Sequence, residues 1–136
     1  MEDVIEKCKK VLIKYENILF AYIFGSYASG RVREDSDIDI AIYLKEKIDT
    51  KEYLDIRMDL MEACGRKVDL IILSKATPLL KFEVYRNNIL LFTRDETLEN
   101  NFKVKTLFEY WDTKKYLDMA YKKNIERIKQ EAETSG

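Results

Sequence analysis

Two short motifs with chemically capable side chains lie close together in the first third of the chain. Gly25 and Ser26 end an apolar run, and ten residues later the sequence continues with Asp37-x-Asp39. A Gly-Ser step between a strand and a helix leaves backbone N–H groups at a turn, and such turns bind phosphate. Asp37 and Asp39 open a second apolar run, and residues i and i+2 of a strand share one face. We therefore expect a phosphate site beside two converging carboxylates.

Two carboxylates that lie close together repel each other, and the pKa of one of them rises unless a cation neutralises them. Hard divalent ions prefer oxygen ligands of this kind. A third acid, Asp69, interrupts an apolar run that otherwise has the pattern of a buried strand. Histidine is absent, so any chemistry must run on carboxylates, hydroxyls, lysine or arginine. The sequence thus predicts a nucleotide and metal site.

The elements that must position these residues follow from the periodicity of the apolar residues. We expect helices over residues 4–15, 28–30, 50–64, 77–86 and 97–131, and strands over residues 19–24, 37–44, 67–73 and 89–92. The strand after the Asp pair should turn Ile38, Ile40 and Ile42 toward covering helices, on the face opposite the aspartates. The expected fold is α/β (α+β), a small mixed sheet flanked by helices with a long C-terminal helix, in a single domain over residues 1–136.

Capping residues mark several of these boundaries. Thr50 is expected to cap the helix over residues 50–64, and Gly65 is expected to stop it. Thr77 and Pro78 have the pattern of a capping hydroxyl followed by proline at the first helical position. Asn87 and Asn88 are expected to turn the chain before the last strand, and residues 131–136 are expected to be frayed.

Composition restricts the possible partners. The chain has 24 basic and 25 acidic residues and a formal net charge of -1, so direct binding to nucleic acid or to an anionic membrane is not expected. It has no signal-peptide pattern and no apolar stretch of about 20 residues, so we expect a cytoplasmic protein. Cys8 and Cys64 are far apart in helical patterns, and we interpret them as small buried apolar groups rather than ligands or a disulfide.

Gly25-Ser26, Asp37-x-Asp39 at this spacing, and Asp69 alone on a following strand resemble the signature of the polymerase-beta-like nucleotidyltransferases, specifically the minimal nucleotidyltransferase (MNT) domain. The resemblance covers about residues 15–95, and the helix over residues 97–131 carries no signature. It implies that Asp37 and Asp39 hold two Mg²⁺ ions and that Asp69 holds the ion that binds the acceptor hydroxyl and can take its proton. It also implies that Ser26 and the backbone N–H groups after Gly25 bind the β and γ phosphates of ATP.

Several basic, polar and aromatic residues outside these motifs have less specific interpretations. We interpret four basic residues as solvated charges rather than phosphate or partner contacts: Arg31, Arg33, Arg66 and Lys67. Ser36 is expected to hydrogen-bond to backbone in the turn before the strand. Three aromatic residues of the last helix are interpreted as core or interface rather than as ligand stackers: Phe108, Trp111 and Tyr121.

The acceptor is the least specified part of the prediction. Small stand-alone members of the family resemble the antitoxin half of type VII HEPN/MNT toxin-antitoxin modules. That resemblance implies transfer of AMP from ATP to a tyrosine hydroxyl of a HEPN ribonuclease toxin, with release of pyrophosphate and neutralisation of the toxin. No residue specifies tyrosine, adenine or HEPN directly. Two alternatives remain open: a non-catalytic antitoxin that acts by binding the toxin, and a nucleotidyltransferase for a small, aminoglycoside-like molecule.

Overall fold

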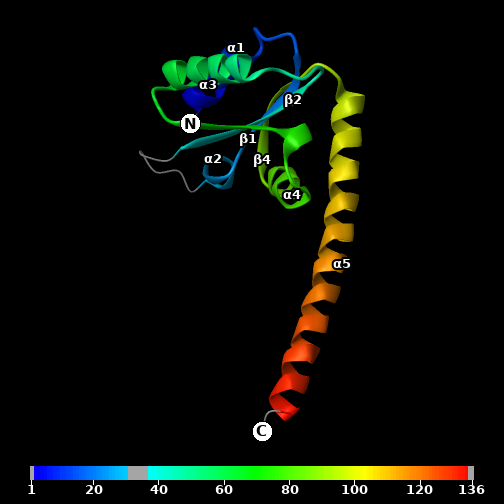
Figure 1. Cartoon of the computed structure of the whole chain (residues 1–136). Helices are drawn as coiled ribbons and strands as arrows, with labels where there is room; N and C mark the ends of the chain where they lie inside the picture. Colours follow the sequence, from blue (N-terminus) through cyan, green and yellow to red (C-terminus); the bar gives the residue numbers. More distant parts are fainter. Residues whose placement is uncertain (1, 31–36, 135–136) are drawn as a thin grey trace.

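The protein forms a four-stranded mixed sheet with helices on both faces (Figure 1). A computed structural model describes residues 2–30 and 37–134. The elements are α1 (Glu2–Leu12), β1 (Ile18–Phe24), α2 (Ser26–Ser29), β2 (Ile38–Leu44), α3 (Thr50–Cys64), β3 (Val68–Ile72), the 3-10 turn η1 (Leu73–Lys75), α4 (Pro78–Arg86), β4 (Asn88–Thr93) and α5 (Glu96–Thr134). The predicted fold class, including the mixed sheet and the long last helix, is confirmed.

The strands lie in the order β3-β2-β1-β4. Strand β1 is antiparallel to β2 and to β4, whereas β2 and β3 are parallel. Helix α3 makes the connection between the two parallel strands, which cannot be joined by a tight turn. This topology makes β3 an edge strand that starts beside the start of β2, so the two aspartate-bearing segments lie next to each other.

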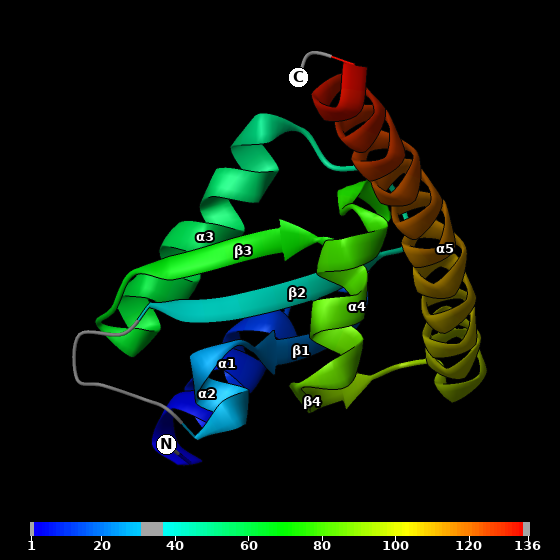
Figure 2. The same ribbon diagram turned by 90° about the horizontal axis from the view of Figure 1, so that it is seen from below.

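One face of the sheet is covered by α1 and α3, as Figures 1 and 2 show. The predicted inward alternation of Ile38, Ile40 and Ile42 is confirmed, because all three side chains are fully buried in the core on this face. Their partners come from both helices and from the neighbouring strands: Cys8, Leu12, Ile56, Leu60, Val68 and Leu70. The isoleucines therefore fix which face of β2 carries the aspartates.

The opposite face is covered by α4 and α5, which pack against each other (Figure 2). Its core includes Ala41 of β2, Ile71 of β3 and Leu80 of α4. Because side chains alternate along a strand, Asp39 and Asp69 lie on this same face, two residues before Ala41 and Ile71. The aspartates thus sit at the end of the sheet that lies beyond the packed part of this second core.

Several predicted boundaries shift by one or a few residues, and one cap is wrong. Helix α3 is capped by Asp49, whose carboxylate accepts the N–H of Glu52 at 2.8 Å, and not by Thr50, which is the first helical residue. Aspartate at an extended backbone position is as good a cap as threonine, so the sequence offered two candidates. Gly65 ends the helix at φ 64, and Thr77 caps α4, both as predicted.

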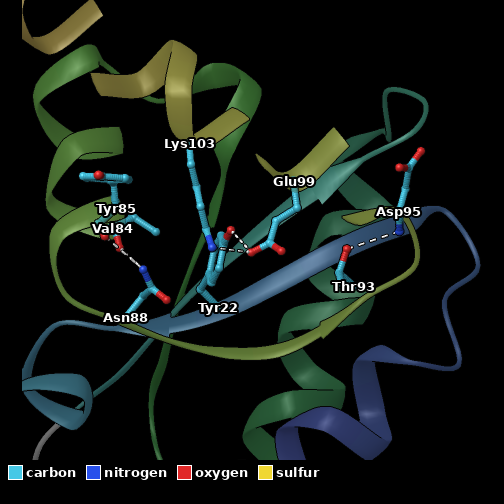
Figure 3. Close-up of polar contacts among 8 residues, drawn as sticks. All are labelled: Tyr22, Val84, Tyr85, Asn88, Thr93, Asp95, Glu99 and Lys103. Atoms are coloured by element: carbon cyan, nitrogen blue, oxygen red, sulfur yellow. Dashed lines mark hydrogen bonds and ion pairs between the residues drawn. The ribbon is translucent and has the colours of Figure 1, made fainter. Parts of the chain in front are cut away.

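Asn88 belongs to strand β4 rather than to a separate turn. Its side-chain amide donates to the carbonyls of Val84 and Tyr85, at 2.9 and 3.1 Å (Figure 3). These bonds satisfy carbonyls at the end of α4 that have no partner within the helix. The chain can therefore pass from helix to strand at Asn87 without an intervening loop.

A buried carboxylate anchors α5 to the sheet. Glu99 is only 4% exposed, and its Oε2 accepts the hydroxyl of Tyr22 at 2.6 Å and lies 3.2 Å from Nζ of Lys103 (Figure 3). Burial and the bond to Glu99 raise the pKa of Tyr22, so the hydroxyl remains a donor. A buried charge is tolerated only where such partners are present, so this contact selects one position for the first turns of α5.

Beyond its first turns α5 leaves the rest of the protein, as Figure 1 shows. Phe108, Trp111 and Tyr121 are 58%, 54% and 65% exposed, so their interpretation as core residues is wrong. Their interpretation as interface residues stays a prediction. The helix also continues through Thr134, so the expected fraying from residue 131 is wrong for residues 131–134. Among the described helices, none is both long and apolar enough to cross a membrane.

We expect Tyr22→Phe to lower the free energy of unfolding by about 1–3 kcal/mol, because it removes a buried hydrogen bond to a charged group. Urea denaturation at pH 7 measures this change. Tyr116→Phe is the matched control, because Tyr116 is 72% exposed on the same helix as Glu99. Equal stability of the two variants would show that the Tyr22 hydroxyl does not hold α5 in place.

Candidate nucleotide and metal site

The parallel pairing of β2 and β3 places Asp39 directly beside Asp69. The two residues are register partners, so their side chains project from adjacent strands on the same face of the sheet. Asp37 lies one residue before β2 and carries its charge close to the pair. Asp39 and Asp69 are therefore brought together, whereas Asp37 is outside the strand that was expected to hold it and acts on Asp39 only through its charge.

The Gly-Ser turn lies next to Asp39 on the side of β2 opposite to Asp69. Phe24, the last residue of β1, is the register partner of Asp39, and Gly25 follows it at φ 70 and ψ -139. A Cβ atom at Gly25 would lie 2.2 Å from Oδ2 of Asp39. Residue 25 must therefore be glycine for two reasons. The backbone conformation has a positive φ, and the Asp39 carboxylate occupies the space that a side chain would need.

Ser26 is the first residue of the short helix α2. The turn is closed by the N–H of Ser29, which donates to the carbonyl of Gly25 at 3.1 Å, and it ends at Gly30 in the left-handed conformation. Three of the five predicted site residues lie on α2, β2 and β3, and a fourth lies between β1 and α2: Ser26, Asp39, Asp69 and Gly25. The role of Gly25 and Ser26 toward phosphate stays a prediction.

The electrostatics of the site are those of crowded negative charges. The pKa of Asp39 is raised from 3.8 to about 6, first by burial, then by the charges of Asp69 and Asp37, and by a hydrogen bond with Asp69. Asp37 forms an ion pair with Lys67, whose Nζ lies 3.9 Å from Oδ2 on the surface. Such an exposed pair contributes little, so Lys67 leaves the repulsion at Asp39 largely uncompensated.

The donor set suits a hard divalent cation in kind, because it consists of carboxylate oxygens that repel one another when no cation is bound. In the side-chain positions of the described residues, however, no group of three or more His, Cys, Asp or Glu is arranged to hold a metal ion. Asp39 and Asp69 are close enough to share a hydrogen bond, whereas Asp37 acts on Asp39 only through its charge. Metal binding by Asp37, Asp39 and Asp69 therefore stays a prediction.

Two residues of α3 that the sequence did not single out also border the site. A cleft of about 510 Å³ beside Asp39 and Asp69 is lined in part by Tyr53 and Arg57. The Tyr53 hydroxyl donates to the carbonyl of Leu70 at 2.6 Å, and Nε of Arg57 donates to the carbonyl of Val68 at 2.9 Å. The sequence predicts only that both residues lie in the helix over residues 50–64. The signal that could have pointed to Arg57 is a charged residue at the helical spacing of buried Ile56 and Leu60.

Arg66 connects the third strand to the Gly-Ser turn. Its guanidinium donates to the hydroxyl of Tyr27 in α2 and lies 5.7 Å from the centre of that ring. Its interpretation as a solvated charge is therefore wrong, whereas Lys67 is exposed as expected. The remaining residues considered from the sequence lie outside the described part of the chain: Arg31, Arg33 and Ser36.

Gly25→Ala should destabilise the protein by several kcal/mol, because the new Cβ requires both an unfavourable backbone conformation and a displaced Asp39. Gly30→Ala is the matched control, since Gly30 also has a positive φ but a Cβ there meets nothing within 4 Å. The control should cost only about 1 kcal/mol. Equal losses in urea denaturation would mean that the approach of Asp39 to Gly25 does not constrain the turn.

With EDTA present, the stability of the protein should fall as pH rises from about 4 to about 6. The folded state holds the Asp39 proton more tightly than the unfolded chain, so the extra stability is complete below pH 3.8 and is lost through pH 6. Asp39→Asn should remove this decline and be more stable at pH 7 by about 2 kcal/mol. Asp112→Asn, at an exposed position, should keep the wild-type pH profile. An unchanged profile in Asp39→Asn would contradict the raised pKa.

Comparisons with known proteins agree with this geometry. Residues 6–97 match the family described as Polymerase beta, Nucleotidyltransferase, a stretch that contains the whole candidate site. The protein adenylyltransferase MntA of Shewanella oneidensis is 32% identical over 89 residues, which make up 65% of this chain and 63% of that protein.

Two solved structures share the fold over most of the chain. A crystal structure of a toxin-antitoxin with AMP-PNP has a TM-score of 0.73 at 26% identity, covering 91% of this chain and 97% of that chain. A tri-AMPylated Shewanella oneidensis HEPN toxin in complex with an MNT antitoxin has a TM-score of 0.68 at 24% identity, covering 92% of this chain and 95% of that chain. Together with the family match, which spans more than half of the sequence, these similarities establish that the chain belongs to the polymerase beta nucleotidyltransferase family.

Proposed function

We propose that this protein is the nucleotidyltransferase antitoxin of a HEPN/MNT toxin-antitoxin module, and that it transfers AMP from ATP to a tyrosine hydroxyl of a HEPN ribonuclease. The observation that carries the proposal is the convergence of Gly25, Asp39 and Asp69 at one end of the sheet, within the family match. The relative named protein adenylyltransferase MntA and the structural neighbour with AMP-PNP support protein as acceptor and ATP as donor.

In this proposal, Asp37, Asp39 and Asp69 hold two Mg²⁺ ions. The ions, when bound, neutralise triphosphate charge and favour ionisation of the acceptor hydroxyl. The support for this set is electrostatic, because the mutual repulsion that raises the pKa of Asp39 is relieved by a bound cation. A bound cation would lower the pKa of Asp39 and keep it ionised below neutral pH as well. Its position between Gly25 and Asp69 suits a ligand that contacts both the donor and the acceptor side of the site.

The reaction would form one bond and break another at the α-phosphorus of ATP. The acceptor oxygen attacks that phosphorus, the bond to the β-phosphate oxygen breaks, and pyrophosphate leaves. Asp69 would accept the proton of the acceptor hydroxyl. Gly25 and Ser26 would hold the β and γ phosphates through backbone N–H groups and the serine hydroxyl at the turn into α2. Holding donor and acceptor in line is the main contribution that such a site can make.

The position of Asp69 suits an acceptor carried by another protein. Asp69 is exposed on an edge strand and borders the 510 Å³ cleft, which shares Tyr53, Ile71 and Leu80 with a second cleft of about 570 Å³. An acceptor side chain can therefore reach the proposed base without crossing the core of this protein. The HEPN toxin as partner follows from the family resemblance, and the neighbour that contains an AMPylated HEPN toxin gives an example of such a pair.

The decisive experiment is to incubate the protein with ATP, Mg²⁺ and the HEPN-type protein encoded beside it, and to measure the intact mass of that protein. We expect a gain of one or more adenylyl units, no gain with Asp39→Asn or Asp69→Asn, and a normal gain with the control Glu16→Gln, at an exposed position before the start of β1. Peptide sequencing should place the modification on tyrosine.

Two results would favour the alternatives. A stable complex on a sizing column without any mass gain would indicate an antitoxin that acts by binding. A lack of both complex and mass gain, together with adenylylation of an aminoglycoside, would indicate a small-molecule enzyme. Unfolding of Asp39→Asn would make its loss of activity uninformative, so its stability must be measured in parallel.

A further inference from the structure

The two cysteines of the chain meet although 56 residues separate them. Cys8 lies on α1, Cys64 is the last residue of α3, and their Sγ atoms are 3.4 Å apart in a thiol hydrogen bond. Both thiols are free, and the sequence contains no other cysteine. Their interpretation as small buried groups holds for Cys8, which is fully buried, whereas Cys64 is only partly buried.

We propose that Cys8 and Cys64 are a redox pair that a peroxide converts into an intramolecular disulfide joining α1 to α3. The distance between the sulfur atoms exceeds a disulfide bond by less than 1.5 Å, taking a bond of about 2.05 Å. Small shifts of the two side chains, one within α1 and one at the last residue of α3, can cover that difference. Neither cysteine belongs to the nucleotide and metal site, so the proposal does not rest on the proposed function.

The two thiols are unequal, and the inequality assigns them different roles. Cys64 is only partly buried and is therefore more accessible than Cys8, and its pKa is lowered by the hydrogen bond with Cys8 and by the charges of Lys7 and Arg66, against the opposing effects of burial and Asp3. The pKa of Cys8 is raised by the same hydrogen bond and by burial. The accessible thiol with the lower pKa is the one that reacts with an oxidant, because the thiolate is the nucleophile.

The chemistry has two balanced steps. The Cys64 thiolate attacks hydrogen peroxide, the O–O bond breaks, and Cys64 becomes a sulfenic acid while hydroxide leaves and takes up a proton as water. The sulfur of Cys8 then attacks the sulfur of Cys64, an S–S bond forms, and a second molecule of water leaves. Overall, two thiols lose two hydrogen atoms and one peroxide is reduced to two molecules of water.

The bond would join α1 covalently to α3, which it otherwise contacts through packing and the hydrogen bond between the two thiols. Helix α3 ends at Cys64, and two residues later Arg66 donates to Tyr27 beside the Gly-Ser turn. Helix α1 begins near the start of the chain and packs on α3 in the core of the first face. A disulfide closing so long a loop restricts the unfolded chain strongly, so the oxidised protein should be the more stable form.

The test uses the full chain, reduced and freed of reductant, and hydrogen peroxide as the oxidant. After each exposure, the protein is denatured, treated with N-ethylmaleimide and weighed intact. We expect both alkylation sites to disappear together with a mass loss of about 2 Da, and dithiothreitol to restore them. We also expect native protein to form the bond faster than protein unfolded in urea. Oxidation no faster than in urea, or covalent dimers on a non-reducing gel, would overturn the proposal.

Two single variants test the separate roles. In Cys8→Ser, Cys64 should stop at the sulfenic acid, which dimedone traps as an adduct. In Cys64→Ser, Cys8 should remain a thiol under the same treatment because it is buried. The melting temperature of the oxidised wild-type protein should rise by on the order of 10 °C. A fall in melting temperature on oxidation, or a dimedone adduct on Cys8, would contradict the assignment.

Discussion

The repulsion between Asp39 and Asp69 is the interaction on which the rest of the structure depends. Their proximity follows from the register of two parallel strands, and parallel strands require a crossover helix, which is α3. The isoleucines that alternate with the acids in β2 keep the carboxylates on one face by burying themselves on the other. The core under α1 and α3 thus stabilises a fold in which repelling carboxylates lie at the edge of the core under α4 and α5.

The same constraint explains why the Gly-Ser turn cannot vary in its first position. The carboxylate of Asp39 occupies the volume in which any side chain at residue 25 would have to start. Strand β1 brings the turn to this point because Phe24 pairs with Asp39. The Gly-Ser turn and the pair of Asp39 and Asp69 are therefore coupled through the close approach of Gly25 to the Asp39 side chain, and neither can be moved without the other.

The sequence predicted those features that depend on local spacing. The Gly-Ser turn, the acidic pair and the alternation of the isoleucines are short-range patterns, and each was placed correctly to within one residue of its strand. The proximity of Asp69 came from the family resemblance, because no local pattern specifies that β3 pairs with β2. The prediction of Thr50 as the cap was wrong because the adjacent Asp49 is an equally competent capping residue.

Features that depend on packing between distant segments were not predicted. The contact of Cys8 with Cys64 requires the relative position of two helices, which periodicity does not give. Arginine is usually a surface residue, yet the guanidinium groups of Arg66 and Arg57 each donate a hydrogen bond to another segment of the chain. The aromatic residues of α5 have a core-like composition, but the sheet is too short to cover a helix of 39 residues. The contact of Glu99 with Tyr22 fixes the first turns of α5, and the last part of the helix extends past the sheet and the other helices.

The bonds that Tyr53 and Arg57 make to β3 have a consequence for how this protein meets other chains. They occupy the outward-facing carbonyls of Leu70 and Val68, which an edge strand would otherwise offer to a strand from outside. Another polypeptide could extend the sheet at this edge only by first breaking both contacts. The sheet edge that carries Asp69 is thereby protected against pairing with strands of other chains. A partner protein must therefore bind through side-chain and surface contacts.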